Sequence, residues 1–185
     1  MASQLLEPVL PQQLAEWRQV IDCKVELRDL SRLAEIVQAD LAVLPAGDRP
    51  ANWRRASVGI RLEFGFARFA ESVPALDGEL SVTLDAVCQR CLEACRVQVN
   101  TTLRYLLLPA DAEAIECEDY EVWELTDKLV RPLDIVEEAL VMAMPFPALH
   151  KSESKCGPLA QEFSTVATET AHPFAGLRAQ LDESK

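Results

Sequence analysis

Hydrophobic and polar residues alternate in several stretches of the chain, which is the pattern of strands with one buried face. The alternation is clearest from Val58 to Phe66, where every second residue is apolar. An Asp77-Gly78 pair predicts a turn before the next such stretch. The sequence therefore predicts strands over Cys23–Leu27, Val58–Phe66, Leu80–Leu84, Val97–Leu107 and Tyr120–Leu125.

Three other stretches have apolar residues at helical spacing. They are Pro11–Val20, Leu30–Ala39 and Ile135–Met144. The last is apolar around much of its circumference, so we expect it to be buried against the sheet. Asp134 stands three residues before Glu137, which predicts a capping box at its start. The sequence thus predicts an α+β fold: an antiparallel sheet of about five or six strands, packed by a buried C-terminal helix and short N-terminal helices.

Size and composition set the expected organisation. The chain has 185 residues, of which 49% are hydrophobic and 26% are charged, as in folded globular proteins. We expect one domain over residues 1–160 and a polar tail over residues 161–185, with an apolar island at Pro173–Leu177. No window is long and apolar enough for a membrane span or a secretion signal. The expected location is the cytoplasm, without a membrane partner.

The net charge of the chain restricts the kinds of partner that it can bind. The formal net charge is -12, which disfavours nucleic-acid binding by charge alone and favours a basic protein partner. Local arginines are the exception, and Arg90 and Arg96 are the candidates for a direct contact with RNA or a partner. The acid-rich stretch Asp111–Glu124 is either a solvated loop or an acidic docking surface.

The sequence Cys88-Gln89-Arg90-Cys91 carries the most specific chemistry. It lies between two predicted strands, so we expect it at the tip of a hairpin, where both sulfurs can face one metal ion. His150 and Cys156 follow the predicted C-terminal helix and would complete a Cys3His structural zinc site. Cys95 is a competing third ligand, whereas Cys23 and Cys117 show no partner spacing.

Thiol-disulfide exchange at Cys88 and Cys91 is the alternative function. A redox pair of this spacing usually begins at a helix N-terminus, but a strand-like segment follows Cys91 too closely for a helix. The chain has no phosphate loop, dinucleotide fingerprint or nucleophile elbow, and only two histidines. We therefore do not expect an enzyme.

Several of these motifs occur together in one known family. In order and spacing, Val82–Cys91, the helix Leu133–Leu140, the following Met144–His150 and the terminal Pro173–Leu177 resemble the bacterial YceD family. Its members are called large ribosomal RNA subunit accumulation proteins. The resemblance implies a non-enzymatic cytoplasmic factor needed for synthesis, processing or stability of 23S ribosomal RNA.

The resemblance also bears on the metal site and the partner. Many relatives carry a second C-x-x-C after the apolar helix, which with the first looks like a four-cysteine zinc site. This chain has only Cys156 with His150 nearby, so either His150 replaces a cysteine or zinc binding is lost. The expected partner is a ribosomal protein or assembly factor, with large-subunit RNA contacted directly or indirectly. Phe174 either covers a crevice on its own domain or docks to that partner.

Overall fold

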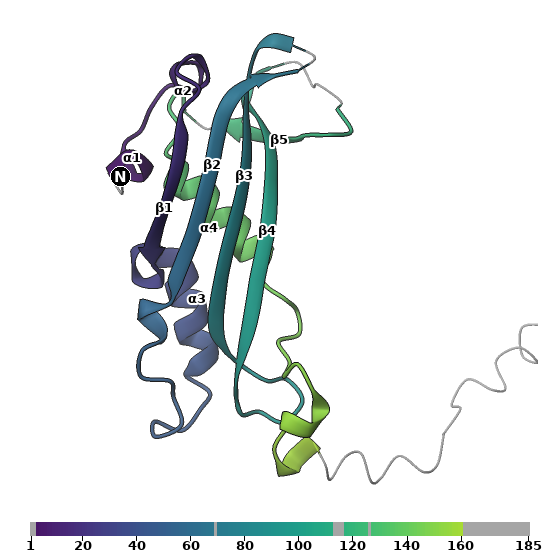
Figure 1. Ribbon diagram of the computed structural model, residues 1–185. Coiled ribbons are helices and arrows are strands. Elements are labelled where there is room, and N and C mark those ends of the chain that lie inside the picture. The colour runs from purple at the N-terminus through teal and green to yellow at the C-terminus, as the bar shows by residue number, and fades with distance from the viewer. Residues whose placement is uncertain (1–2, 69, 113–116, 126, 161–185) are drawn as a thin grey trace, which may run out of the picture.

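The computed structural model describes residues 3–68, 70–112, 117–125 and 127–160. Within them, five strands form one sheet in the order β1-β2-β3-β4-β5 (Figure 1). The strands are β1 (Val20–Glu26), β2 (Ser57–Ala67), β3 (Ala70–Val87), β4 (Ala94–Pro109) and β5 (Glu121–Leu125). The helices are α1 (Ser3–Leu6), α2 (Pro11–Glu16), α3 (Ser31–Leu41) and α4 (Pro132–Met142), with 3-10 turns η1 (Leu27–Asp29), η2 (Trp53–Arg55) and η3 (Glu153–Lys155). The α+β class is as predicted.

The sheet is mixed, so the prediction of a purely antiparallel sheet is wrong. β1 to β4 pair antiparallel, but β5 runs parallel to β4, with Tyr105 opposite Glu121 and Pro109 opposite Leu125. An antiparallel neighbour needs only a tight turn, whereas a parallel neighbour needs a connection that returns along the sheet. Of the acid-rich stretch, Asp111, Glu118 and Asp119 lie in this connection, whereas Glu121 and Glu124 belong to β5.

The predicted turn at Asp77-Gly78 is also wrong, because β3 continues through both residues. Gly78 pairs with Leu62 of β2 on one side and with Leu103 of β4 on the other. A Cβ at Gly78 would lie 2.9 Å from Leu62 Cδ2 and 3.0 Å from the carbonyl oxygen of Arg61. The glycine therefore serves close packing inside the sheet and does not reverse the chain.

One face of the sheet is covered by α3 and α4. The core contains alternating strand residues together with residues of both helices. In Figure 1, α4 lies behind the strands. The backbone N–H of Leu33 in α3 donates to Glu137 Oε1 in α4 at 3.0 Å, and Arg32 pairs with Glu138. From α4, the core includes Leu133, Ile135, Val136, Ala139 and Leu140.

The helix boundaries differ from the prediction at two places. α2 ends at Glu16, Arg18 adopts a φ of 47°, and Val20 already begins β1. Trp17 is consequently 63% exposed and does not pack into the core. α4 begins at Pro132, ahead of the predicted start, so Asp134 lies inside the first turn and accepts from Arg131 Nε at 2.9 Å. The predicted capping box at Asp134 is wrong.

The opposite face of the sheet is polar over most of its length, apart from a small buried cluster of Ala67, Ala75, Leu106 and Leu108. Cross-strand register brings Asp22, Arg61, Glu79 and Thr102 into one row across four strands. Arg61 Nη2 lies 2.7 Å from Glu63 Oε1, and Arg61 Nη1 lies 3.5 Å from Asp22 Oδ2. Alternation thus separates apolar from charged side chains as the sequence predicts. No helix in the described part of the chain is long and apolar enough to cross a membrane.

Replacing Gly78 with alanine should lower the free energy of unfolding by about 1 to 3 kcal/mol, because the added methyl group overpacks the buried contact with Leu62. Gly65 of β2 is the matched control, since a Cβ there meets nothing within 4 Å. Gly65→Ala should change stability by less than about 1 kcal/mol. Urea denaturation of both variants measures the difference, and equal effects would contradict the close approach at Gly78.

Candidate metal centre

The C-x-x-C lies at the tip of the β3–β4 hairpin, as predicted. β3 ends at Val87 and β4 begins at Ala94. The tip is closed by two backbone hydrogen bonds: Cys88 N–H donates to the Glu93 carbonyl at 2.9 Å, and Leu92 N–H donates to the Cys88 carbonyl at 2.8 Å. Leu92 adopts a φ of 60°, which is unusual for a bulky residue. This turn buries the side chains of Cys88 and Cys91.

Helix α3 fixes the base of this tip. Asp40 Oδ2, near the end of α3, accepts from the backbone N–H of Val87 at 2.7 Å. Val87 directly precedes Cys88, so the helix holds the strand where the turn begins. Asp40 and Val87 lie far apart in the sequence and share no local motif, so sequence reasoning missed this contact.

The chain after α4 returns to the tip and brings the second pair of predicted ligands. Gln89 N–H donates to the Ala148 carbonyl at 2.9 Å, which joins the tip directly to the segment before His150. Beyond His150 the short helix η3 turns the chain, and Cys156 N–H donates to the Glu153 carbonyl at 2.9 Å. Cys156 is therefore buried next to the hairpin tip.

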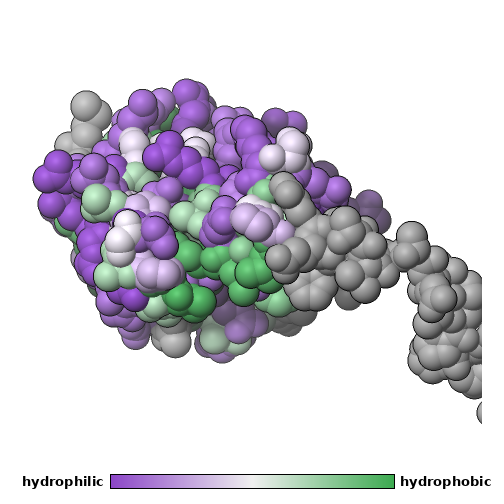
Figure 2. Space-filling view, turned by 90° about the horizontal axis from the view of Figure 1, so that it is seen from below, coloured by the Kyte–Doolittle hydropathy of each residue, from purple (hydrophilic) through white to green (hydrophobic). Residues whose placement is uncertain are grey.

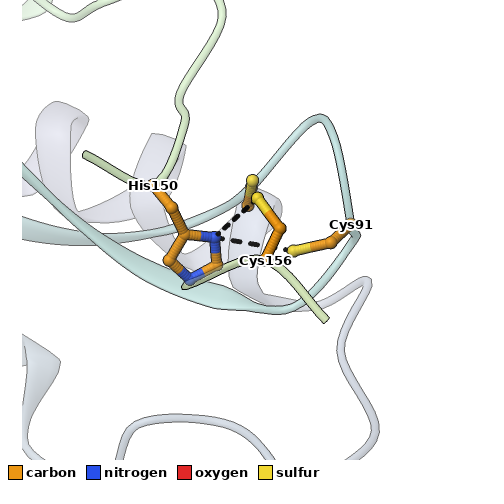
Figure 3. A group of neighbouring side chains, drawn as sticks. Cys91, His150 and Cys156 are labelled. Atoms are coloured by element: carbon orange, nitrogen blue, oxygen red, sulfur yellow. Dashed lines mark hydrogen bonds between the residues drawn. The ribbon is translucent and has the colours of Figure 1, made fainter. Parts of the chain in front are cut away.

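Three sulfurs and one imidazole meet at this point. The ligand atoms of Cys88, Cys91, His150 and Cys156 all lie within 4.8 Å of one another. His150 Nδ1 lies 3.5 Å from Cys91 Sγ and 3.6 Å from Cys156 Sγ, and Figure 3 shows these side chains pointing toward one another. The sequence predicted the same four residues as a ligand set.

The donor spacing fits a tetrahedral metal ion. Bond lengths of about 2.3 Å to sulfur and 2.0 Å to nitrogen, at a tetrahedral angle, place the two donors about 3.5 Å apart. The two nitrogen–sulfur distances agree with this value. Three soft thiolates and an imidazole are also a donor set that tetrahedral metals such as zinc prefer. The group can therefore hold a metal ion.

The thiols of the group differ in acidity. Burial raises the pKa of Cys88, but hydrogen bonds from the backbone N–H groups of His150, Arg90 and Cys91 outweigh it and lower the pKa to about 6. Burial and the neighbouring sulfurs of Cys88 and Cys91 raise the pKa of Cys156. Hydrogen bonds from the backbone therefore favour a thiolate at Cys88, whereas burial and the neighbouring sulfurs disfavour a second thiolate at Cys156. A cation among the sulfurs would remove that opposition, because metal ligands must be deprotonated.

Cys95, the competing ligand, lies outside this group. It is on β4 opposite Ala86 and is buried. Burial, followed by the nearby charge of Cys88, raises the pKa of Cys95 to about 11. Such a thiol stays protonated at neutral pH. Cys23 and Cys117 are half-buried and likewise outside the group.

The two candidate arginines have different surroundings. Arg90 Nη1 lies 3.3 Å from Glu153 Oε1 and 4.0 Å from Cys156 Sγ, so this side chain links the tip to η3. Arg96 projects from β4, pairs with Asp85 at 3.3 Å and is largely exposed. Contact of either residue with RNA or a partner stays a prediction. Phe174 and the apolar island Pro173–Leu177 lie outside the described residues.

In metal-free protein, ultraviolet absorbance of the thiolate should show a group titrating near pH 6, which is the pKa of Cys88. An ordinary cysteine titrates near pH 8.5, so the folded state favours the ionised form. The resulting stabilisation is present above the unfolded-state pKa and is lost as the pH falls through about 6. Cys88→Ser should abolish this titration and Cys95→Ser should retain it. A first thiolate appearing only above pH 8 would contradict the assignment.

Comparison with known proteins agrees with this arrangement of motifs. A search of curated proteins and a search of solved structures each gave no match. The family model described as "Large ribosomal RNA subunit accumulation protein YceD" matches residues 76–181, more than half of the chain. The matched span begins in β3 and includes Cys88, Cys91, His150 and Cys156. The chain therefore belongs to the YceD family of large ribosomal RNA subunit accumulation proteins.

Proposed function

We propose that this protein is a cytoplasmic ribosome-biogenesis factor that supports synthesis, processing or stability of 23S ribosomal RNA by binding, without catalysing a reaction. Membership of the YceD family is the observation that carries the proposal. The proposed contact is with a basic ribosomal protein or assembly factor. Large-subunit RNA is reached through that partner and through local contacts.

The metal we propose is zinc, in a structural role. Cys88, Cys91, His150 and Cys156 supply all four ligands, which leaves no position for a substrate or a water molecule, as in closed zinc sites. The hydrogen bonds from backbone N–H groups to Cys88 support a thiolate that binds metal. Zinc there would join the hairpin tip to the segment after α4. In this proposal His150 takes the place of the cysteine that the resemblance to the family implies at this position.

Thiol-disulfide exchange is the less favoured function of the same cysteines. Cys88 and Cys91 lie in a turn between two strands and not at the start of a helix. A third sulfur and an imidazole share their surroundings, which suits coordination better than exchange between two thiols. The lowered pKa of Cys88 serves either chemistry, so it does not discriminate between them. The four-ligand geometry favours the metal.

A hollow at the tip fits a basic partner. This tip hollow has a volume of about 700 Å³ and combines apolar walls with the carboxylates of Asp48 and Glu93. Leu92 and Leu159 are 52% and 45% exposed there, and Figure 2 shows hydrophobic residues gathered at this end of the molecule. Apolar anchors with a charged rim are typical of protein interfaces. Its lining comprises Leu44, Pro45, Asp48, Cys91, Leu92, Glu93, Ala94, Pro158 and Leu159.

Protein purified without a chelator should contain about one equivalent of zinc, because one set of four ligands is present. Cys156→Ser should lower the zinc content by removing a ligand. Cys95→Ser is the matched control, since Cys95 is a buried cysteine outside the ligand group, and should retain zinc. Elemental analysis measures the metal. Less than about a tenth of an equivalent in the parent protein would refute the zinc site.

The double substitution Leu92→Lys and Leu159→Lys should remove the protein partners captured from lysate after nuclease treatment, because it replaces two apolar side chains of the tip hollow with positive charges that repel a basic partner. It should also lower the ratio of 23S to 16S RNA in cells that carry only this variant. Met142→Lys is the control: Met142 is an exposed apolar residue at the end of α4 and outside the tip hollow. Zinc content of each variant reports whether the tip is intact. Unchanged partners and RNA ratio in the double variant would exclude the hollow as the docking site.

A further inference from the structure

A second hollow lies beside the metal centre and has the opposite charge. It has a volume of about 560 Å³ and shares the side chain of His150 with the ligand group. Three of its lining residues are cationic and one is anionic. We call it the basic hollow, and its lining comprises Pro50, Asp85, Ala94, Cys95, Arg96, His150, Lys151 and Lys155.

The positive charge of the basic hollow contrasts with the net charge of the chain, which is -12. Other hollows on the described part of the chain are balanced or acidic. The tip hollow contains only the negative charges of Asp48 and Glu93. A hollow on the polar face of the sheet contains two acids and two bases, and one beside β5 contains three acids and Arg104. Positive charge is therefore concentrated next to the metal centre, against the field of the whole molecule.

The cations of the basic hollow are available to a ligand. Lys151 and Lys155 are exposed and form no ion pair with any other described residue. Arg96 contacts Asp85 through Nε alone, and the Arg96 side chain is 77% exposed. Its two terminal nitrogens can still donate hydrogen bonds. A lysine is a compact positive charge, and an arginine presents a fork that matches phosphate oxygens.

The fold also holds these cations in place. Lys151 directly follows His150 and Lys155 directly precedes Cys156, so two ligands of the metal centre bracket the loop that carries both lysines. Inside that loop, Lys155 N–H donates to the Ser152 carbonyl at 3.1 Å, and Glu153 pairs with Arg90 of the tip. The backbone positions that carry these charges are thus set before a ligand arrives, which lowers part of the entropic cost of binding it.

We propose that the basic hollow binds phosphate groups of the RNA backbone, with Arg96, Lys151 and Lys155 as the contacting residues. This inference rests on the proposed function, since the family's link to ribosomal RNA favours RNA over other phosphate ligands. Backbone contacts carry no sequence information, so the hollow positions RNA and does not select it. The protein partner bound at the tip hollow determines which RNA is bound. A metal ion held by His150 and Cys156 would support the RNA contact by fixing the loop that carries Lys151 and Lys155.

The test uses the full chain and a short fluorescein-labelled single-stranded RNA, with binding followed by fluorescence anisotropy over a range of salt concentrations. Lys151→Ala with Lys155→Ala should weaken binding about tenfold at low salt and reduce the logarithmic salt slope by roughly 1.4, the value for two phosphate contacts. The control is Lys24→Ala with Lys128→Ala, which removes the same charge from β1 and from the loop after β5. The control should bind RNA like the parent chain.

Zinc content and partner capture separate the possible failures. Unchanged zinc in both double variants excludes loss of the fold as the cause. Equal weakening by both lysine pairs, or no RNA binding by the parent chain at low salt, overturns the basic hollow but leaves the partner model standing. Loss of nuclease-resistant partners from the Lys151/Lys155 variant, with RNA binding unchanged, would assign the hollow to an acidic protein group instead. An unaltered 23S-to-16S ratio in cells lacking the whole chain would overturn the proposed function itself.

Discussion

Convergence of three sulfurs and an imidazole at one end of the sheet is the constraint that organises this protein. The group draws on a hairpin tip and on a segment that follows a helix, so it forms only when β3, β4 and α4 are in place. Backbone N–H groups stabilise one thiolate at Cys88, while the buried neighbours disfavour further ionisation. A buried cluster of this kind is costly as free thiolates and favourable around a cation. Both proposed binding surfaces lie directly beside it.

The tip hollow and the basic hollow carry opposite charge. The tip hollow offers apolar side chains and carboxylates, which suit a basic protein. The basic hollow offers three cations, which suit phosphate. Ribosomal assembly intermediates present both chemistries close together, since basic proteins lie on anionic RNA. A chain with net charge -12 can engage such a junction if several cations lie together next to the surface that contacts protein.

Local patterns in the sequence predicted much of the fold and the ligand group. Alternation located the strands, and the C-x-x-C between two of them identified the tip. The predictions that were wrong concern contacts between residues far apart in the sequence. Asp77-Gly78 predicted a turn, but Gly78 instead packs closely against Leu62 within β3. The parallel direction of β5 was also missed, because no local pattern sets it. The sequence did not predict the basic hollow either, because β4 and the loop that carries Lys151 and Lys155 come together only in the folded protein.

The spacing of the ligand group along the chain has a consequence for unfolding. Cys91 and His150 are 59 residues apart, and β4, β5 and α4 all lie between them. A metal shared by these residues would act as a cross-link across that length of chain. By the polymer estimate used for disulfides, closing a loop of this size removes about 4 kcal/mol of unfolded-state entropy. In Figure 1, β5 lies at the opposite end of the sheet from the tip, so a metal at one end would restrain the denatured conformations of a strand at the other.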